Sequence, residues 1–172
     1  RLAPHLREIP QPVIAAVNGV AAGAGLGIAL ASDIRIASES ARFTSVFVKR
    51  SLVPDAGVSE ILISLAGPGI AAEMSFTGRI YDANWALSRG LVNDVISANE
   101  LMAQSQSMAL EIAANPPLAV KATKRLFNIH HTSLNKVILA EHRANDPLRG
   151  TSDQKEAIQA FLEKLTPKFT GT

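Results

Sequence analysis

Apolar residues follow two different patterns along the chain. In the first half, short apolar runs alternate with segments of helical spacing. This predicts strands over residues 13–17, 34–37, 42–44 and 92–96 and helices over residues 25–31, 58–65, 70–76 and 82–89. The second half carries helical patterns alone, over residues 98–114, 117–127, 134–145 and 152–164. We therefore expect an α/β core over residues 1–96 and a helical region over residues 97–172.

Residues that start and stop helices support these boundaries. Gly90 follows the helix predicted over residues 82–89, and Pro117 stands where the first residue of a helix tolerates proline. Ser152 is a candidate N-cap for the last predicted helix.

A glycine cluster separates the first predicted strand from the helix that follows it. Gly23 and Gly25 have no Cβ atom, so a ligand can lie against their main-chain N–H groups. The first turn of the helix adds unpaired N–H donors that carry partial positive charge. This segment is therefore a candidate site for an anion or a developing oxyanion.

Three other interpretations of the cluster compete with this one. A dinucleotide fingerprint requires G-x-G-x-x-G, but Ile28 stands where the third glycine would fall, and no acidic residue follows at the expected distance. A P-loop requires Gly-Lys-Ser/Thr, which is absent here. The glycines could also serve only close packing between helix and strand.

The surrounding motifs decide between these interpretations, because together they resemble the enoyl-CoA hydratase/isomerase (crotonase) family in the family's own order. The motifs are IPQPVIAAVNG at 9–19, GAGL at 23–26, ALASD at 29–33, ARF at 41–43, LVPDAG at 52–57, TG at 77–78, ALSRGLV at 86–92, FLEK at 161–164 and PKFTG at 167–171. The resemblance implies a crotonase-like ββα superhelix, with residues 2–9 similar to the helix before the family's central strand. It also implies that roughly the first third of a usual member, including several strands and one oxyanion-hole donor, would precede Arg1.

The resemblance further implies a CoA thioester as substrate and no bound cofactor apart from the CoA of that substrate. It implies homotrimers, often paired into hexamers, formed through the helical region. A run of amphipathic helices without its own sheet must bury its apolar faces on the preceding layer or on another subunit.

Catalysis on a thioester requires donors for the negative charge that develops on the carbonyl oxygen. By resemblance, the second oxyanion-hole N–H belongs to Ala24. The two glutamates of typical hydratases are matched by Gly27 and Phe47, neither of which can transfer a proton. Their loss argues against ordinary hydration, which needs groups to activate water and to handle the α-proton.

Asp55 is the remaining candidate acid/base, since it matches an aspartate of double-bond isomerases in the family. One carboxylate can carry a proton between two carbons, and we expect Phe47, Leu52 and Val53 to surround it with apolar surface that favours its protonated form. The alternative is that Asp55 only caps the next helix. Isomerisation is thus the predicted reaction; a non-catalytic acyl-CoA carrier and a hydratase with atypical residues are the alternatives.

Binding residues are also assigned through the resemblance. Phe161 and Lys164 correspond to a Phe and a Lys beside CoA, although Phe161 could equally be core and Lys164 solvent-facing. Gly23 and Gly25 would lie against the thioester, and Leu26 and Phe47 are candidates for the wall of an acyl pocket.

Composition excludes several other classes of protein. The net charge of +2, with dispersed basic residues and one Trp and one Tyr, offers no nucleic-acid interface. No apolar run is long enough to predict a membrane span, and no His or acidic spacing predicts a metal site. The absence of cysteine excludes disulfides and suits a cytoplasmic protein, with mitochondrial or peroxisomal locations left open.

Overall fold

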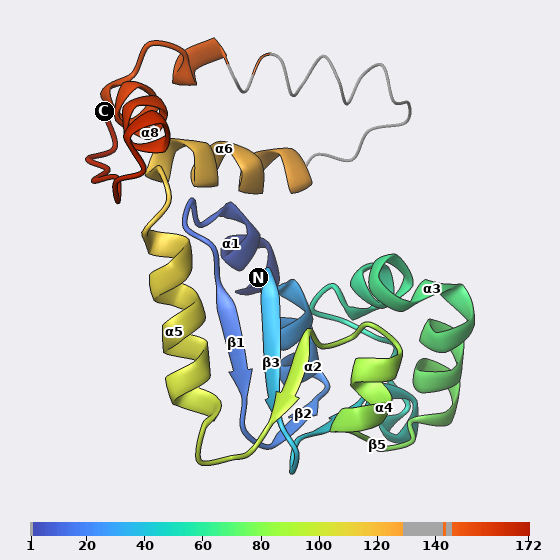
Figure 1. The fold of residues 1–172 in the computed structure, drawn as a ribbon. Helices are drawn as coiled ribbons and strands as arrows, with labels where there is room; N and C mark the ends of the chain where they lie inside the picture. The colour runs from blue at the N-terminus through green and yellow to red at the C-terminus, as the bar shows by residue number, and fades with distance from the viewer. Residues whose placement is uncertain (1, 129–142, 144–145) are drawn as a thin grey trace. The chain divides into compact units, whose positions relative to one another are not determined.

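The structure, a computed structural model, describes residues 2–128, 143 and 146–172 (Figure 1). It divides into two compact units. The first unit contains Arg1–Ile9 and Val13–Gln106, and the second contains Pro10–Pro12 and Ser107–Thr172. The predicted functional division after residue 96 stays a prediction. Apart from Arg143, the helix predicted over 134–145 lies outside the described residues.

The first unit contains two three-stranded sheets (Figure 1). In the first sheet, β3 (Ile34–Ser38) lies between β1 (Ile14–Val17) and β6 (Asp94–Ile96), and both pairings are parallel. In the second sheet, β4 (Arg42–Thr44) pairs in parallel with β2 (Val20–Ala22) and antiparallel with β5 (Tyr81–Asp82).

The chain visits these sheets in a repeating strand-strand-helix order. It passes from β1 through β2 into helix α2 (Ala24–Ala31), then from β3 through β4 and the 3₁₀ helix η1 (Val46–Arg50) into helix α3 (Val58–Thr77). Helix α1 (Leu2–Glu8) precedes the first repeat, and α4 (Ala83–Ser88) lies between β5 and β6. Because the chain returns to each sheet through a helix, consecutive strands of that sheet can be parallel.

The predicted strands at 13–17, 34–37, 42–44 and 92–96 all correspond to observed strands, with small shifts at their ends. The two helices predicted at 58–65 and 70–76 are two halves of α3, separated by a kink at Gly67 and Pro68. Strands β2 and β5 and the 3₁₀ helix η1 were not predicted from the sequence.

The core of the first unit forms around helix α2. Leu26 and Leu30 of this helix are fully buried and belong to one cluster with Phe43, Leu62 and Met74. Helix α2 is apolar throughout, although Ala24, Gly25 and Ile28 are exposed at its open side. Its mainly small residues let β2, α1 and α3 approach it closely.

A buried arginine links three segments of the same unit. Arg35 Nε donates to the Leu91 carbonyl at 2.8 Å, and Nη1 donates to the carbonyls of Ser32 at 2.5 Å and Leu30 at 3.4 Å. Burial lowers the pKa of Arg35, nearby Arg7 lowers it further, and Asp33 raises it. The guanidinium nevertheless stays charged, since arginine does not lose its proton in proteins.

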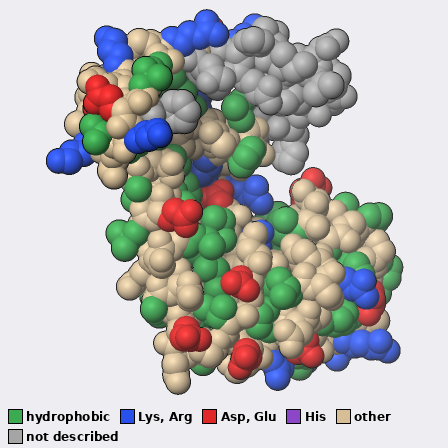
Figure 2. Space-filling view, in the orientation of Figure 1, with side chains coloured by type: hydrophobic (Ala, Val, Ile, Leu, Met, Phe, Trp, Pro, Cys, Tyr) green, Lys and Arg blue, Asp and Glu red, His purple; other side chains and the backbone are tan. Residues whose placement is uncertain are grey.

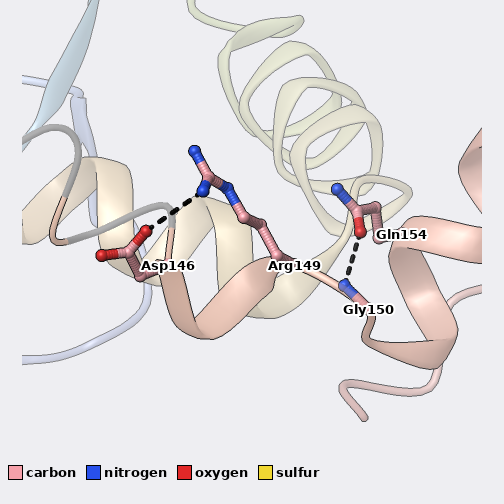
Figure 3. A network of polar contacts seen from close by, with 4 residues as sticks. All are labelled: Asp146, Arg149, Gly150 and Gln154. Carbon is pink, nitrogen blue, oxygen red and sulfur yellow. Dashed lines mark hydrogen bonds and ion pairs between the residues drawn. The ribbon is translucent and has the colours of Figure 1, made fainter.

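Helix α5 (Leu101–Ala113) runs from the first unit into the second, which also contains α6 (Pro117–Phe127), η2 (Asp146–Leu148) and α8 (Ser152–Glu163). Pro117 begins α6, as predicted. The predicted N-cap of the last helix is wrong: Ser152 is already helical, and Thr151 Oγ1 accepts from Gln154 N at 3.1 Å. Figure 3 shows the neighbouring contacts from Asp146 to Arg149 and from Gly150 to Gln154.

The C-terminal residues fold back onto helix α8. Asp153 Oδ1 accepts from Thr170 N at 2.7 Å, and its Oδ2 accepts from Gly171 N at 2.9 Å. The Asp153 N–H in turn donates to the Thr172 carbonyl at 3.0 Å. The Asp153 carboxylate thus satisfies main-chain donors of a segment that has no helix or strand of its own.

Apolar side chains also reach the surface, where Figure 2 shows them among acidic and basic ones. In the second unit they include Leu110, Phe127 and Leu162, each more than two-thirds exposed. Within the described residues, none of the helices combines the length and the hydropathy that crossing a membrane requires.

Candidate active site

Helix α2 begins with main-chain donors that point away from the rest of the helix. Gly23 has a φ of 53°, a left-handed conformation that glycine adopts at little cost, and its N–H donates to the Thr44 carbonyl at 3.3 Å. The first helical bond runs from Gly27 N to the Gly23 carbonyl at 3.1 Å. Among the described residues, the N–H groups of Ala24, Gly25 and Leu26 have no acceptor.

These donors differ in how open their surroundings are. Ala24 and Gly25 are exposed, and a Cβ built on Gly25 would meet no atom within 4 Å. Leu26 is fully buried in the core. The accessible main-chain donors at this end of the helix are therefore the N–H groups of Ala24 and Gly25.

Phe47 lies beside this glycine segment. It belongs to η1 and is only 6% exposed. A Cβ built on Gly23 would lie 3.8 Å from two atoms of the Phe47 ring, which is ordinary van der Waals contact. The structure thus brings Phe47 to the start of α2 and places Leu26 in the core behind it.

Asp55 occupies a tight turn before helix α3. The Val58 N–H donates to the Asp55 carbonyl at 2.9 Å, and the two residues between them, Ala56 and Gly57, have φ values of 50° and 82°. Positive φ at both central positions is the geometry of a type I′ turn. The side chain of Asp55 is exposed and has no hydrogen-bond or ion-pair partner in the described part of the chain.

The alternative interpretation of Asp55 as a helix cap is wrong. The N-cap residue of α3 is Gly57, and no side chain caps that end of the helix. The expected apolar enclosure of the carboxylate is also wrong for two of its three residues. Leu52 and Val53 are 61% and 79% exposed, because they lie in an irregular segment that directs them to solvent.

The turn that carries Asp55 packs directly against helix α2. A Cβ built on Gly27 would lie 2.8 Å from both the Cβ and the carbonyl oxygen of Ala56. Gly27 stands one helical turn after Ala24, so the turn contacts the same helix that presents the free amides. The sequence indicated only that Gly27 lacks a carboxylate; it gave no sign that Ala56 fills the space.

The predicted CoA-contact pair lies in the second unit. Lys164 is exposed, has a φ of 57° and follows the last residue of α8, so it lies just beyond the helix predicted to contain it. The Leu165 N–H donates to the Ala160 carbonyl at 2.9 Å, which closes the helix in a Schellman arrangement. The side chain of Phe161 lies outside the described part of the structure.

Comparison with known proteins identifies the family. The family model for enoyl-CoA hydratase/isomerase matches residues 1–172. The chain belongs to this family. Its two-sheet architecture is that of the crotonase fold, and a crystal structure of an enoyl-CoA hydratase from Bacillus anthracis superposes with a TM-score of 0.96 at 37% identity, covering 99% of this chain and 66% of the other.

Similar sequences include enzymes with different reactions. The short-chain-enoyl-CoA hydratase of Clostridium acetobutylicum is 40% identical over 161 residues, which cover 93% of this chain and 62% of that protein. The 1,2-epoxyphenylacetyl-CoA isomerase of Escherichia coli K12 is 37% identical over 168 residues, which cover 97% and 64%. The chain therefore spans less than two thirds of the length of these two relatives, and family membership alone does not select the reaction.

Members of this family act on CoA thioesters, typically without a metal or other cofactor. Within residues 2–128, 143 and 146–172, no group of three or more His, Cys, Asp or Glu side chains could hold a metal ion.

Proposed function

We propose that the protein isomerises the double bond of an enoyl-CoA, with Asp55 as the proton carrier and the Ala24 N–H as a donor to the thioester oxygen. The observation that carries this proposal is the unpartnered Asp55 carboxylate, held on a turn that packs against the helix with free first-turn amides. An exposed carboxylate without a partner is available to a substrate.

The proposed reaction starts with a β,γ-unsaturated acyl-CoA. The Asp55 carboxylate removes a proton from the carbon next to the thioester carbonyl, and the electron pair moves onto the carbonyl oxygen to form a dienolate. The Ala24 N–H stabilises that negative charge, and only the backbone is required for this. The protonated Asp55 then returns the proton to the γ-carbon, which gives the α,β-unsaturated product and restores the carboxylate.

Hydration is the competing reaction, since one of the similar proteins is a short-chain-enoyl-CoA hydratase. It requires a second acid/base group beside the one that handles the α-proton. The positions matched to the hydratase glutamates hold Gly27 and the buried Phe47, and Gly27 faces Ala56. These contacts support isomerisation over hydration.

The remaining binding roles are part of the same proposal. Gly23 and Gly25 would leave room for the thioester at the start of α2. Phe47 and Leu26 would form apolar surface behind it. Phe161 and Lys164 would contact CoA.

Homotrimers or hexamers would cover the exposed Leu110, Phe127 and Leu162 of the second unit. Native mass spectrometry tests this assembly, and a monomeric mass would contradict it.

The test of the reaction uses full-length protein and a β,γ-unsaturated acyl-CoA in deuterium oxide, with deuterium incorporation and double-bond position followed together. We expect Asp55→Asn to lower kcat by about 100- to 10,000-fold, the usual contribution of a general acid/base. Glu60→Gln is the matched control, because Glu60 is an exposed carboxylate in the first turn of α3 and should leave kcat within about twofold.

Two results would count against isomerisation by Asp55. Undiminished isomerisation by Asp55→Asn would remove the assigned role of that residue. Tight acyl-CoA binding without exchange or double-bond movement would instead favour the non-catalytic carrier.

A further inference from the structure

Gly27 is in much closer contact with its surroundings than the other helical glycines. A Cβ at this position would lie 2.8 Å from the Ala56 Cβ, 2.8 Å from the Ala56 carbonyl oxygen and 3.3 Å from Val58 Cγ2. By contrast, a Cβ on Gly25 or Gly69 would meet nothing within 4 Å. One of the two nearest atoms is the main-chain carbonyl oxygen of Ala56, which cannot rotate aside as a flexible side chain can.

The other partner in this contact is itself in a costly conformation. Ala56 has a φ of 50°, a region that residues with a Cβ seldom occupy. Such a conformation persists where the surrounding structure holds it. Here the holding contacts are the Val58 to Asp55 hydrogen bond and the packing of Ala56 on Gly27.

We propose that Gly27 is a positioning residue for Asp55, a role that rests on the proposed isomerase function. The turn from Asp55 to Val58 packs against the Cα atom of Gly27. This contact fixes the position of the Asp55 carboxylate relative to the Ala24 amide, which lies one helical turn away. The same contact fills the space that a longer side chain at residue 27 would need. A second carboxylate at that position would displace the first, so the packing restricts the site to single-carboxylate chemistry.

The main experiment compares Gly27→Ala with Gly69→Ala in full-length protein. Both substitutions add one methyl group to a glycine within a helix, but only the first meets Ala56. We expect Gly27→Ala to lower kcat by about 10- to 100-fold with little change in KM, since a small displacement of a catalytic group has effects of that size. Gly69→Ala should match the wild type.

A readout independent of turnover is the amide hydrogen exchange of Val58, whose N–H closes the turn. Gly27→Ala should speed this exchange, whereas Gly69→Ala should not. Because the turn can be followed without any substrate, its response is measurable even if the protein proves not to be an isomerase.

Ala56→Gly gives a variant that is not at risk of misfolding. Glycine suits the positive φ of residue 56, so the melting temperature should stay the same or rise. The Cβ part of the contact with Gly27 is lost, however, while the carbonyl oxygen of residue 56 remains, and the freer turn should lower kcat several-fold. A merely structural role for this packing predicts no loss of kcat in a variant that is equally or more stable.

The outcomes separate this inference from the proposed function. If Asp55→Asn abolishes isomerisation but Gly27→Ala equals Gly69→Ala in kcat and in Val58 exchange, the positioning role is overturned and the isomerase proposal stands. Full kcat in Ala56→Gly would likewise overturn it. If the wild-type protein does not isomerise the substrate, the proposed isomerase function is rejected. If Gly27→Ala also leaves the hydrogen exchange of Val58 unchanged, the contact between residues 27 and 56 does not hold the turn either.

Discussion

The two units each bury a charged side chain, but in very different surroundings. In the first unit, Arg35 is 5% exposed and donates to three carbonyls within a large apolar cluster. In the second unit, Asp153 is 2% exposed and accepts from a C-terminal segment. Among the side chains described there, the only other buried ones are Lys124 and Ala160.

The difference shows how each unit is held together. The first unit encloses its apolar side chains, and its buried Arg35 adds hydrogen bonds between main-chain segments that are distant in the sequence. The described part of the second unit relies on buried polar groups, while Leu110, Phe127 and Leu162 remain exposed. Burial of apolar surface is the main stabilising contribution in folding, and the described residues of the second unit bury less of it than those of the first.

The largest expected effect comes from removing the buried cation of the first unit. Arg35→Met should lower the free energy of unfolding by about 3 kcal/mol, because buried carbonyl oxygens would lose a charged donor. Urea denaturation followed by the fluorescence of Trp85, the single tryptophan, measures this loss in the unit that contains Arg35.

Arg50→Met is the control for this substitution. Arg50 is exposed and, among the residues that the structure describes, donates only to the neighbouring Lys49 carbonyl, so its loss should change stability by less than about 0.5 kcal/mol. Equal effects of the two substitutions would mean that the hydrogen bonds of Arg35 contribute little to the free energy of unfolding and that the apolar cluster alone stabilises the unit.

The contrast between the units also explains what the sequence could predict. Continuous apolar runs such as residues 13–17 identified the buried strands, and the α/β core followed by helices is observed. Arg35 is flanked by the apolar Ile34 and Ile36 in its strand, and its partner Leu91 lies 56 residues away, so local pattern could not reveal its burial. The same limit applies to Asp153, whose partners lie 17 and 18 residues further along.

The candidate site was predictable to a similar extent. The glycine cluster and Asp55 could be identified because the donors and the carboxylate are carried by local motifs. The packing of Ala56 on Gly27 joins segments 29 residues apart in the numbering, and it depends on a left-handed alanine that no propensity would suggest. Residue types can therefore nominate the chemistry, whereas the relative placement of the groups requires the fold.

A smaller effect should follow from loosening the second unit. Asp153→Ala should lower the free energy of unfolding by about 2 kcal/mol, because the main-chain donors of Thr170 and Gly171 lose a charged acceptor. Hydrogen exchange should speed up at these two amides, while the amides of the first unit keep the wild-type rates.

Asp146→Ala is the matched control within the same unit. Asp146 forms an ion pair with Arg149 at 3.5 Å, but the two side chains are 64% and 66% exposed (Figure 3). An exposed pair of this kind contributes little, so stability should change by less than about 0.5 kcal/mol. If Asp153→Ala behaved like this control, the tail contact would not stabilise the second unit.

The smallest predicted effect concerns a neutral buried group and depends on pH. Tyr81 donates to Glu73 Oε1 at 3.0 Å and stacks on Trp85 with ring centroids 3.9 Å apart. Burial raises the pKa of Tyr81 above its ordinary value of about 10. The folded state therefore favours the protonated phenol, whose stabilising contribution is complete below pH of about 10 and is lost as the pH rises through the higher pKa of the folded protein.

Tyr81→Phe should lower stability by about 1 kcal/mol at neutral pH, through loss of the hydrogen bond to Glu73. It should also make the decline of stability in alkali shallower than in the wild type. Tyr81 is the single tyrosine, so the difference between the two proteins at each pH isolates its ionisation from that of the lysines. Trp85 fluorescence should report the change in the first unit, and parallel alkaline curves for the two proteins would show that burial of the phenol does not couple to folding.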